Sequence, residues 1–141
     1  MSIWSTRPTL EALRQQAMGT LIEHLGIEFL EVGDDYLSAR LPVDARTVQP
    51  FGILHGGASV ALAETLGSAA ANWCVNRAEK RCVGLDINAN HVRATRSGYV
   101  TGTARPLHLG ATTHVWEIRI EDEQARLVCI ARLTMAVLKR E

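Results

Sequence analysis

Small and apolar residues dominate the stretch Phe51–Asn76, which reads FGILHGGASVALAETLGSAAANWCVN. After Gly56-Gly57 this pattern predicts a helix of about five turns. Within the stretch only Glu64 carries a full charge at neutral pH. A helix that is apolar or small on every side has no face that prefers water, so we expect it in the interior. A carboxylate there is costly to bury without compensation, and Glu64 is therefore the first candidate for chemistry.

Alternation of apolar and polar residues dominates the rest of the chain. It predicts a hairpin of strands 24–30 and 36–43, joined at Gly33-Asp34-Asp35, and four further strands at 83–93, 99–107, 113–120 and 126–138. Thr9 is expected to cap a short helix that begins the chain. Strands, one buried helix and a run of strands with short turns indicate a single α+β domain, residues 1–141, on an antiparallel sheet.

The predicted sheet implies association. One helix covers only one sheet face, and the outer strands leave unpaired edges. The strand that contains Asp86, Asn88 and Asn90 places these polar side chains on one face, which is typical of a subunit contact or a wet site. We therefore expect at least a dimer.

Composition limits the classes of function. The chain has 141 residues, with Lys plus Arg equal to Asp plus Glu at 15 each, so no basic excess points to nucleic acid or a membrane surface. No apolar run reaches the roughly 20 residues of a membrane span. Three separated cysteines without a CxxC motif indicate reduced thiols in a cytoplasmic protein. No metal-ligand spacing, phosphate loop or dinucleotide fingerprint appears, so no metal or cofactor is expected.

Three neighbours of Glu64 are further candidates. Gly56 begins the helix and exposes backbone N–H groups at its positive end, which is suitable for an oxyanion, although a plain tight turn after His55 is an equal alternative. Ser68 follows Glu64 by one helical turn on the same face. Gln49 supplies a neutral amide in the loop before the helix, where a solvated side chain is the alternative. For Glu64 itself the alternative is a structural carboxylate.

A basic cluster lies at the end of the third predicted strand. His91, Arg93 and Arg96 are close in sequence and could hold phosphates, although the residues alone favour a solvated surface cluster.

Several motifs together resemble a known family. QPFGILHGGAS, with AETLGS in register behind it, is accompanied by GDDYL, VGLDINANHVRATR, PLHLG and RLTMAVL. The chain resembles the hotdog-fold acyl-CoA thioesterases of the phenylacetate-type branch over almost its whole length. The resemblance implies a long central helix wrapped by a curved antiparallel sheet. It also implies dimers that pair into tetramers, with active sites between chains.

The resemblance also implies site residues. Glu64 matches the family's catalytic carboxylate. The Gly56 N–H, with His55 and Gln49, would polarise the thioester carbonyl. Ser68 would position the attacking water or the carboxylate. Contacts with the acyl-CoA, particularly its nucleotide end, are implied for Gly84, His91, Val92, Arg93, Ala94, His108, Leu109, Gly110, Ala111, Thr112 and Thr113. Leu54, Val60, Leu66 and Trp73 are expected to line the acyl pocket.

The expected activity is hydrolysis of an aromatic acyl-CoA, such as 1,4-dihydroxy-2-naphthoyl-CoA or a hydroxybenzoyl-CoA, to the free acid and CoA. Glu64 would act as nucleophile or as general base, and the sequence leaves both open. One alternative is proofreading hydrolysis of a misacylated aryl carrier protein. Two others keep the fold: a hydratase or dehydratase of acyl thioesters, and a non-catalytic acyl-CoA sensor.

Overall fold

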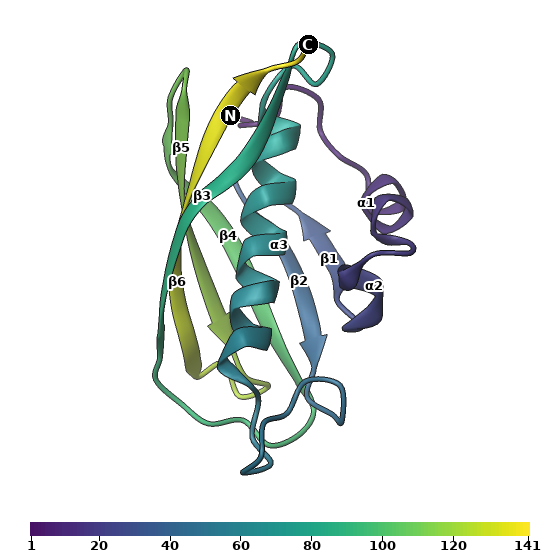
Figure 1. The fold of residues 1–141 in the computed structure, drawn as a ribbon, viewed down its shortest axis with the longest axis vertical. Coiled ribbons are helices and arrows are strands. Elements are labelled where there is room, and N and C mark those ends of the chain that lie inside the picture. Colours follow the sequence, from purple (N-terminus) through teal and green to yellow (C-terminus); the bar gives the residue numbers. More distant parts are fainter.

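A computed structural model describes all 141 residues. Helices α1 (Leu10–Ala17) and α2 (Leu21–His24) precede strands β1 (Glu28–Val32) and β2 (Leu37–Pro42). The long helix α3 (Gly56–Cys74) is followed by β3 (Lys80–His91), β4 (Tyr99–Leu109), β5 (Thr113–Glu121) and β6 (Leu127–Lys139). All pairs are antiparallel, in the order β1-β2-β4-β5-β6-β3. The sheet curls around α3 (Figure 1), so the expected hotdog α+β fold is confirmed.

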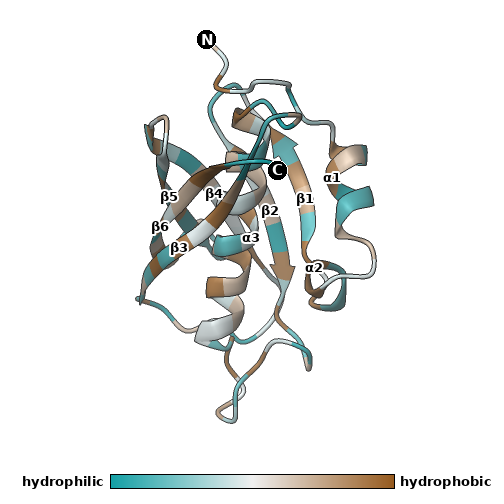
Figure 2. Cartoon of the chain, turned by 45° about the horizontal axis from the view of Figure 1, so that its top comes forward, coloured by the Kyte–Doolittle hydropathy of each residue, from teal (hydrophilic) through white to brown (hydrophobic).

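The core lies between α3 and the concave face of the sheet. Leu62 and Leu66 are fully buried there. A Cβ on Gly67 would come 2.5 Å from Leu133 Cδ2, and one on Gly102 would come 2.8 Å from Leu66 Cδ1. These two glycines let the helix approach the sheet closely, which fixes its position along the strands. Hydrophobic and hydrophilic residues alternate along β2 (Figure 2), whereas the hydrophobic residues Phe29 and Leu30 are adjacent in β1, where its pairing with β2 shifts register.

The opposite side of α3 is only half-buried. Its residues Glu64, Thr65, Ser68, Ala69, Asn72 and Trp73 lie between the layer of α1 and α2 and the edge strand β3. The expectation of a helix buried on every side is therefore wrong for the single chain, because the sheet covers one side of α3 and nothing in the chain closes the other.

The strand predictions hold after α3 and shift before it. The hairpin between β1 and β2 is confirmed, but β1 begins at Glu28 instead of residue 24. Leu21–His24 forms a short helix in its place, since the Thr20 side chain accepts a hydrogen bond from the Ile22 N–H and Gly26 turns the chain at φ 75°.

Strand β3 forms an open edge of the sheet. Val83 and Leu85 are exposed on it, as are the polar residues Asp86, Asn88 and Asn90. The pairing of β3 with β6 is interrupted by a bulge between Gly84 and Asp86. No helix in the structure combines the length and the hydropathy needed to cross a bilayer.

Candidate active site

The loop before α3 holds the side chain of Gln49 by its carbonyl oxygen. The Phe51 N–H donates to Gln49 Oε1. The Gln49 N–H donates to the Ile53 carbonyl oxygen, and the N–H of Gly52, which adopts φ 79°, donates to the Gln49 carbonyl oxygen. Since only an oxygen can accept the bond from the Phe51 N–H, the NH2 group of Gln49 remains free to donate to a ligand.

His55 caps the first turn of α3. Its Nδ1 accepts the Gly57 N–H at 2.7 Å, and its carbonyl oxygen accepts the N–H groups of Ala58 and Ser59. Nε2 then carries the ring proton when the imidazole is neutral and points away from the cap. Of the first four N–H groups of the helix, only that of Gly56 has no acceptor in the chain. It lies at the positive end of the helix dipole.

Gly56 lines a cavity of about 400 Å³. Gln49 and Gly56 line it together with His91, Val92, Arg93 and Ala94. The His91 imidazole occupies the space beside Gly56, where a Cβ would come 2.9 Å from Nε2. The structure thus brings Gly56 and Gln49, two of the three expected oxyanion donors, next to one of the two expected CoA-binding segments, whereas His55 does not line the cavity.

Glu64 lies in a second cavity, also of about 400 Å³, with Thr65 and Ser68. Its carboxylate forms no ion pair in the chain and rests against Gly84, where a Cβ would collide with Oε2. Ser68 lines the same cavity one turn further along α3. A half-buried carboxylate without a partner is suited to proton abstraction or nucleophilic attack.

The two cavities do not share a residue. Gly56 and Glu64 are separated by eight helical residues, which is about 12 Å along the axis of α3. A reacting carbonyl must lie about 3 Å from both its oxyanion donors and its nucleophile. Gly56 and Glu64 of one chain therefore cannot act on the same thioester.

The other expected CoA-binding segment lies far from the first. Residues 108–113 comprise the end of β4, the turn after it and the first residue of β5. His91–Ala94 lie toward the opposite end of β4, about 33 Å away at the usual rise per strand residue. Leu109, Gly110 and Ala111 line a third cavity of about 300 Å³, near the end of α3. The structure does not bring the two segments together within one chain.

Sequence reasoning missed Asn72. Its Oδ1 accepts the Cys82 N–H at 2.8 Å, and its Nδ2 donates to the carbonyl oxygens of Cys82 and Ser68. Asn72 therefore ties α3 to β3 one turn beyond Ser68. The sequence places Asn72 eight residues after Glu64, near the same face of the helix, and could have identified it as a neighbour of the site. No motif identifies Cys82 as its partner.

The expected acyl-pocket residues separate into different places. Trp73 lines the Glu64 cavity and Leu54 lines the Gly56 cavity. Leu66 is fully buried against the sheet, so its assignment to an open pocket is wrong. Val60 is half-buried on α3 and lines neither of these cavities.

Comparisons with known proteins agree with this architecture. The model of the thioesterase superfamily matches residues 51–129. 1,4-Dihydroxy-2-naphthoyl-CoA hydrolase of Escherichia coli is 54% identical over 96% of this chain and 99% of its own length. Proofreading thioesterase EntH of Cronobacter turicensis is 54% identical over 96% of this chain and 98% of its own.

A solved structure gives the same result. A mutant thioesterase of Pseudomonas aeruginosa superposes with a TM-score of 0.97 and 52% identity, covering 99% of this chain and 100% of that one. The roles of the individual site residues stay predictions. The chain belongs to the thioesterase superfamily, with the hotdog fold, and is a thioester hydrolase.

Proposed function

We propose that the chain hydrolyses an aromatic acyl-CoA to the free acid and CoA. The observation that carries the proposal is the complementary state of two groups on α3: the Glu64 carboxylate has no partner, and the Gly56 N–H has no acceptor. The first supplies a base or nucleophile, and the second supplies a donor for the oxyanion. The E. coli relative that is named for an aromatic acyl-CoA supports this class of substrate.

The donors act on the thioester carbonyl. The Gly56 N–H and the free NH2 of Gln49 polarise the carbonyl oxygen and stabilise the negative charge that develops on it. His55 keeps the Gly56 N–H in place by capping the neighbouring N–H of Gly57. A water-excluded site strengthens these hydrogen bonds.

Glu64 forms or activates the attacking group. As a nucleophile, a Glu64 oxygen bonds to the acyl carbon, the C–S bond breaks, and the CoA thiolate takes a proton; water then cleaves the anhydride. As a general base, Glu64 takes a proton from water, which attacks the same carbon; the C–S bond then breaks, and the CoA thiolate receives that proton. Ser68, on the same helix face, positions the water or the carboxylate.

A second copy of the chain completes each site. Because Gly56 and Glu64 of one chain lie about 12 Å apart along the helix, the donors come from one chain and the acid from the other. The open edge of β3 and the half-buried face of α3 are the surfaces that a second copy would cover. We propose a dimer, which pairs again into a tetramer.

The CoA moiety extends from the Gly56 side. His91 and Arg93, beside Gly56, offer donors and positive charge for its phosphates. Because residues 108–113 lie at the far end of β4, they would reach the same CoA only from another chain of the assembly.

A carrier-protein thioester is the second candidate substrate. The relative from C. turicensis is named a proofreading thioesterase, and its identity to this chain equals that of the E. coli hydrolase. Rates of hydrolysis of a CoA thioester and of a carrier-protein thioester decide between the two substrates.

Thiol release from a panel of thioesters tests the proposal. The panel contains 1,4-dihydroxy-2-naphthoyl-CoA, a hydroxybenzoyl-CoA and a misacylated aryl carrier protein, and it is assayed with the wild type, Glu64→Gln and Glu11→Gln. Glu64→Gln is expected to lose about 10²- to 10⁴-fold in kcat. Glu11, exposed on α1, is the matched control and is expected to change nothing. Undiminished turnover by Glu64→Gln would contradict the proposed site. Wild-type protein that binds or hydrates the acyl thioesters without releasing thiol would contradict the proposed reaction.

Single-turnover hydrolysis in oxygen-18 water separates the two roles of Glu64. Label incorporated into the Glu64 carboxylate supports the anhydride route. This label requires that water attacks the Glu64 carbon of the anhydride; label in the product acid alone shows that water attacks the acyl carbon, as the general-base route requires.

A further inference from the structure

The cavity that holds Glu64 ends in two arginines. Arg77 and Arg140 line it at the C-terminal end of α3, together with Trp73. Trp73 lies nine residues beyond Glu64, which is about 14 Å along the helix axis. The cavity therefore has a carboxylate at one end and two guanidinium groups at the other.

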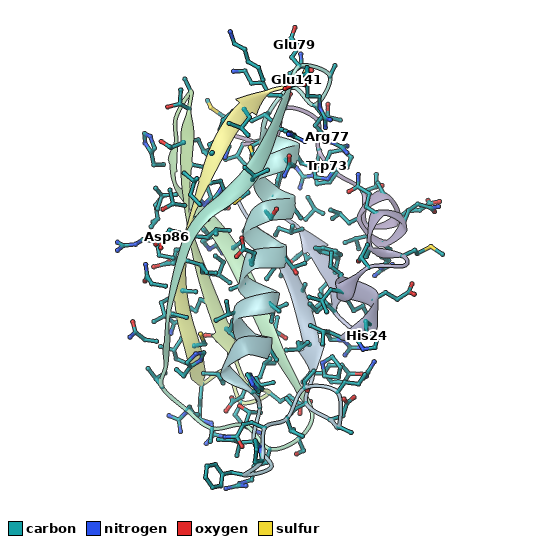
Figure 3. The ribbon with its side chains drawn as sticks, in the orientation of Figure 1. His24, Trp73, Arg77, Glu79, Asp86 and Glu141 are labelled. Carbon is teal, nitrogen blue, oxygen red and sulfur yellow. The ribbon has the colours of Figure 1, made fainter.

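Arg77 is held in a fixed orientation. Its guanidinium carbon lies 4.0 Å from the centroid of the Trp73 ring. Stacking on an aromatic face fixes the plane of the guanidinium and leaves its N–H groups free at the edge. Figure 3 shows Trp73 and Arg77 side by side where α3 ends.

Neither arginine has an anionic partner. Each of the chain's six ion pairs uses another arginine. In the side chain of Arg140 only Nε donates a hydrogen bond, to the Lys80 carbonyl oxygen at 3.2 Å. Glu79 and Glu141 lie at the same end of the molecule (Figure 3), but neither forms an ion pair with them. The end of the cavity therefore keeps its positive charge and most of its donors.

The orientation of the bound acyl-CoA decides which part of it lies near these arginines. That orientation rests on the proposed function. The CoA moiety lies on the side of Gly56 and His91, in the other chain. The acyl group then continues from Glu64 along α3 toward Trp73. Ile22, Ala69 and the Trp73 ring offer apolar surface for its body.

We propose that Arg77 and Arg140 bind a carboxylate at the far end of the acyl group, so that the chain prefers aromatic acyl thioesters that end in a carboxylate. A guanidinium fork matches a carboxylate in shape and charge and binds it through two parallel hydrogen bonds. The distance between Glu64 and the two arginines determines which length of aromatic body fits between the thioester and the carboxylate.

Matched pairs of substrates test this preference. Mono-CoA thioesters of terephthalic, naphthalene dicarboxylic and biphenyl dicarboxylic acid provide a rigid series of increasing length. Each is compared with its methyl ester, which has the same shape without the charge. At the length that reaches Arg77, kcat/KM for the acid is expected to exceed that for the ester by about tenfold or more.

Variants locate the preference. The double variant Arg77→Gln/Arg140→Gln is expected to reduce the acid-to-ester ratio to about one, and Arg77→Lys is expected to keep part of it because the charge remains. Arg81→Gln removes a nearby exposed charge outside the cavity and is expected to keep the wild-type ratio. Each ratio is measured within one protein, so a partial loss of folded enzyme cancels from it.

Two results would overturn the inference alone: esters hydrolysed as well as acids at every length, or a double variant that keeps the wild-type ratio. If neither these pairs nor the thioesters of the first panel released thiol, the proposed function would fall together with this inference.

Discussion

The backbone of Gly84 lies against the carboxylate of Glu64, and a Cβ at position 84 would collide with Oε2 of the acid. Gly84 belongs to the edge strand β3 at the start of its bulge, whereas Glu64 belongs to α3. The strand therefore sets the position of the acid. Gly84, which the resemblance assigns to acyl-CoA contact, acts in the single chain as the wall against which Glu64 rests.

Gly84→Ala is expected to displace the Glu64 carboxylate and to lower kcat/KM about 10- to 100-fold, because misplacement of a reacting group by about 1 Å costs on this scale. Thiol release measures the loss. In the Glu64→Gln background the same substitution should cause no further loss in rate. If the two losses multiplied instead, Gly84 would act independently of Glu64.

His55→Ala removes the side-chain cap of α3. The Gly57 N–H then loses its acceptor, and the free energy of unfolding is expected to fall by about 1 kcal/mol in urea denaturation. His55→Asn keeps an oxygen acceptor at the cap and should retain most of the stability. An equal loss in both variants would contradict the capping role.

Asn72 ties α3 to β3 through both atoms of its amide. Asn72→Ala leaves the Cys82 N–H and C=O groups without these partners and is expected to destabilise the fold by about 1–3 kcal/mol. Asn72→Asp keeps the acceptor but loses the two donors, so an intermediate loss is expected. Asn76→Ala, which removes an acceptor from the exposed Ala78 N–H, serves as the control and should cost less. The midpoints of urea denaturation compare the stabilities of these three variants.

His114 makes stability dependent on pH. Burial lowers the pKa of its imidazole, and nearby His108 lowers that pKa further. Below the ordinary value of about 6.5, the unfolded chain binds a proton that the folded chain excludes, so stability falls as the pH decreases from 7 to 5. His114→Gln is expected to reduce this loss, whereas His24→Gln, on an exposed residue, should not. Identical pH profiles for all three proteins would refute the assignment.

Strands β5 and β6 were predictable because apolar and polar residues alternate along each of them between turns. Trp116, Ile118 and Ile120, for example, are fully buried, whereas the intervening Glu117 and Arg119 are exposed. Strand β1 was harder to predict, because HLGIEFL alternates weakly and the competing short helix depends on local capping by Thr20. Local hydrogen bonds of this kind override weak periodicity.

The candidate site was predictable in its residues but not in its geometry. Sequence motifs identify Gly56 and Glu64, and helical rise alone separates them by about 12 Å. They do not identify contacts between distant segments, such as Glu64 with Gly84 or Asn72 with Cys82. Such contacts depend on how closely the helix approaches the sheet, which is decided by glycines on both elements.

Mixed dimers of two variants, each changed in one half of the site, test the central claim, that each site combines Glu64 of one chain with Gln49 and Gly56 of another. Glu64→Gln and Gln49→Ala are co-expressed with different tags, the mixed dimers are isolated by tandem affinity purification, and thiol release is measured. Each mixed dimer holds one intact site and one doubly defective site, so about half of the wild-type activity per dimer is expected. Activity no higher than the mean of the two parent variants would contradict the account.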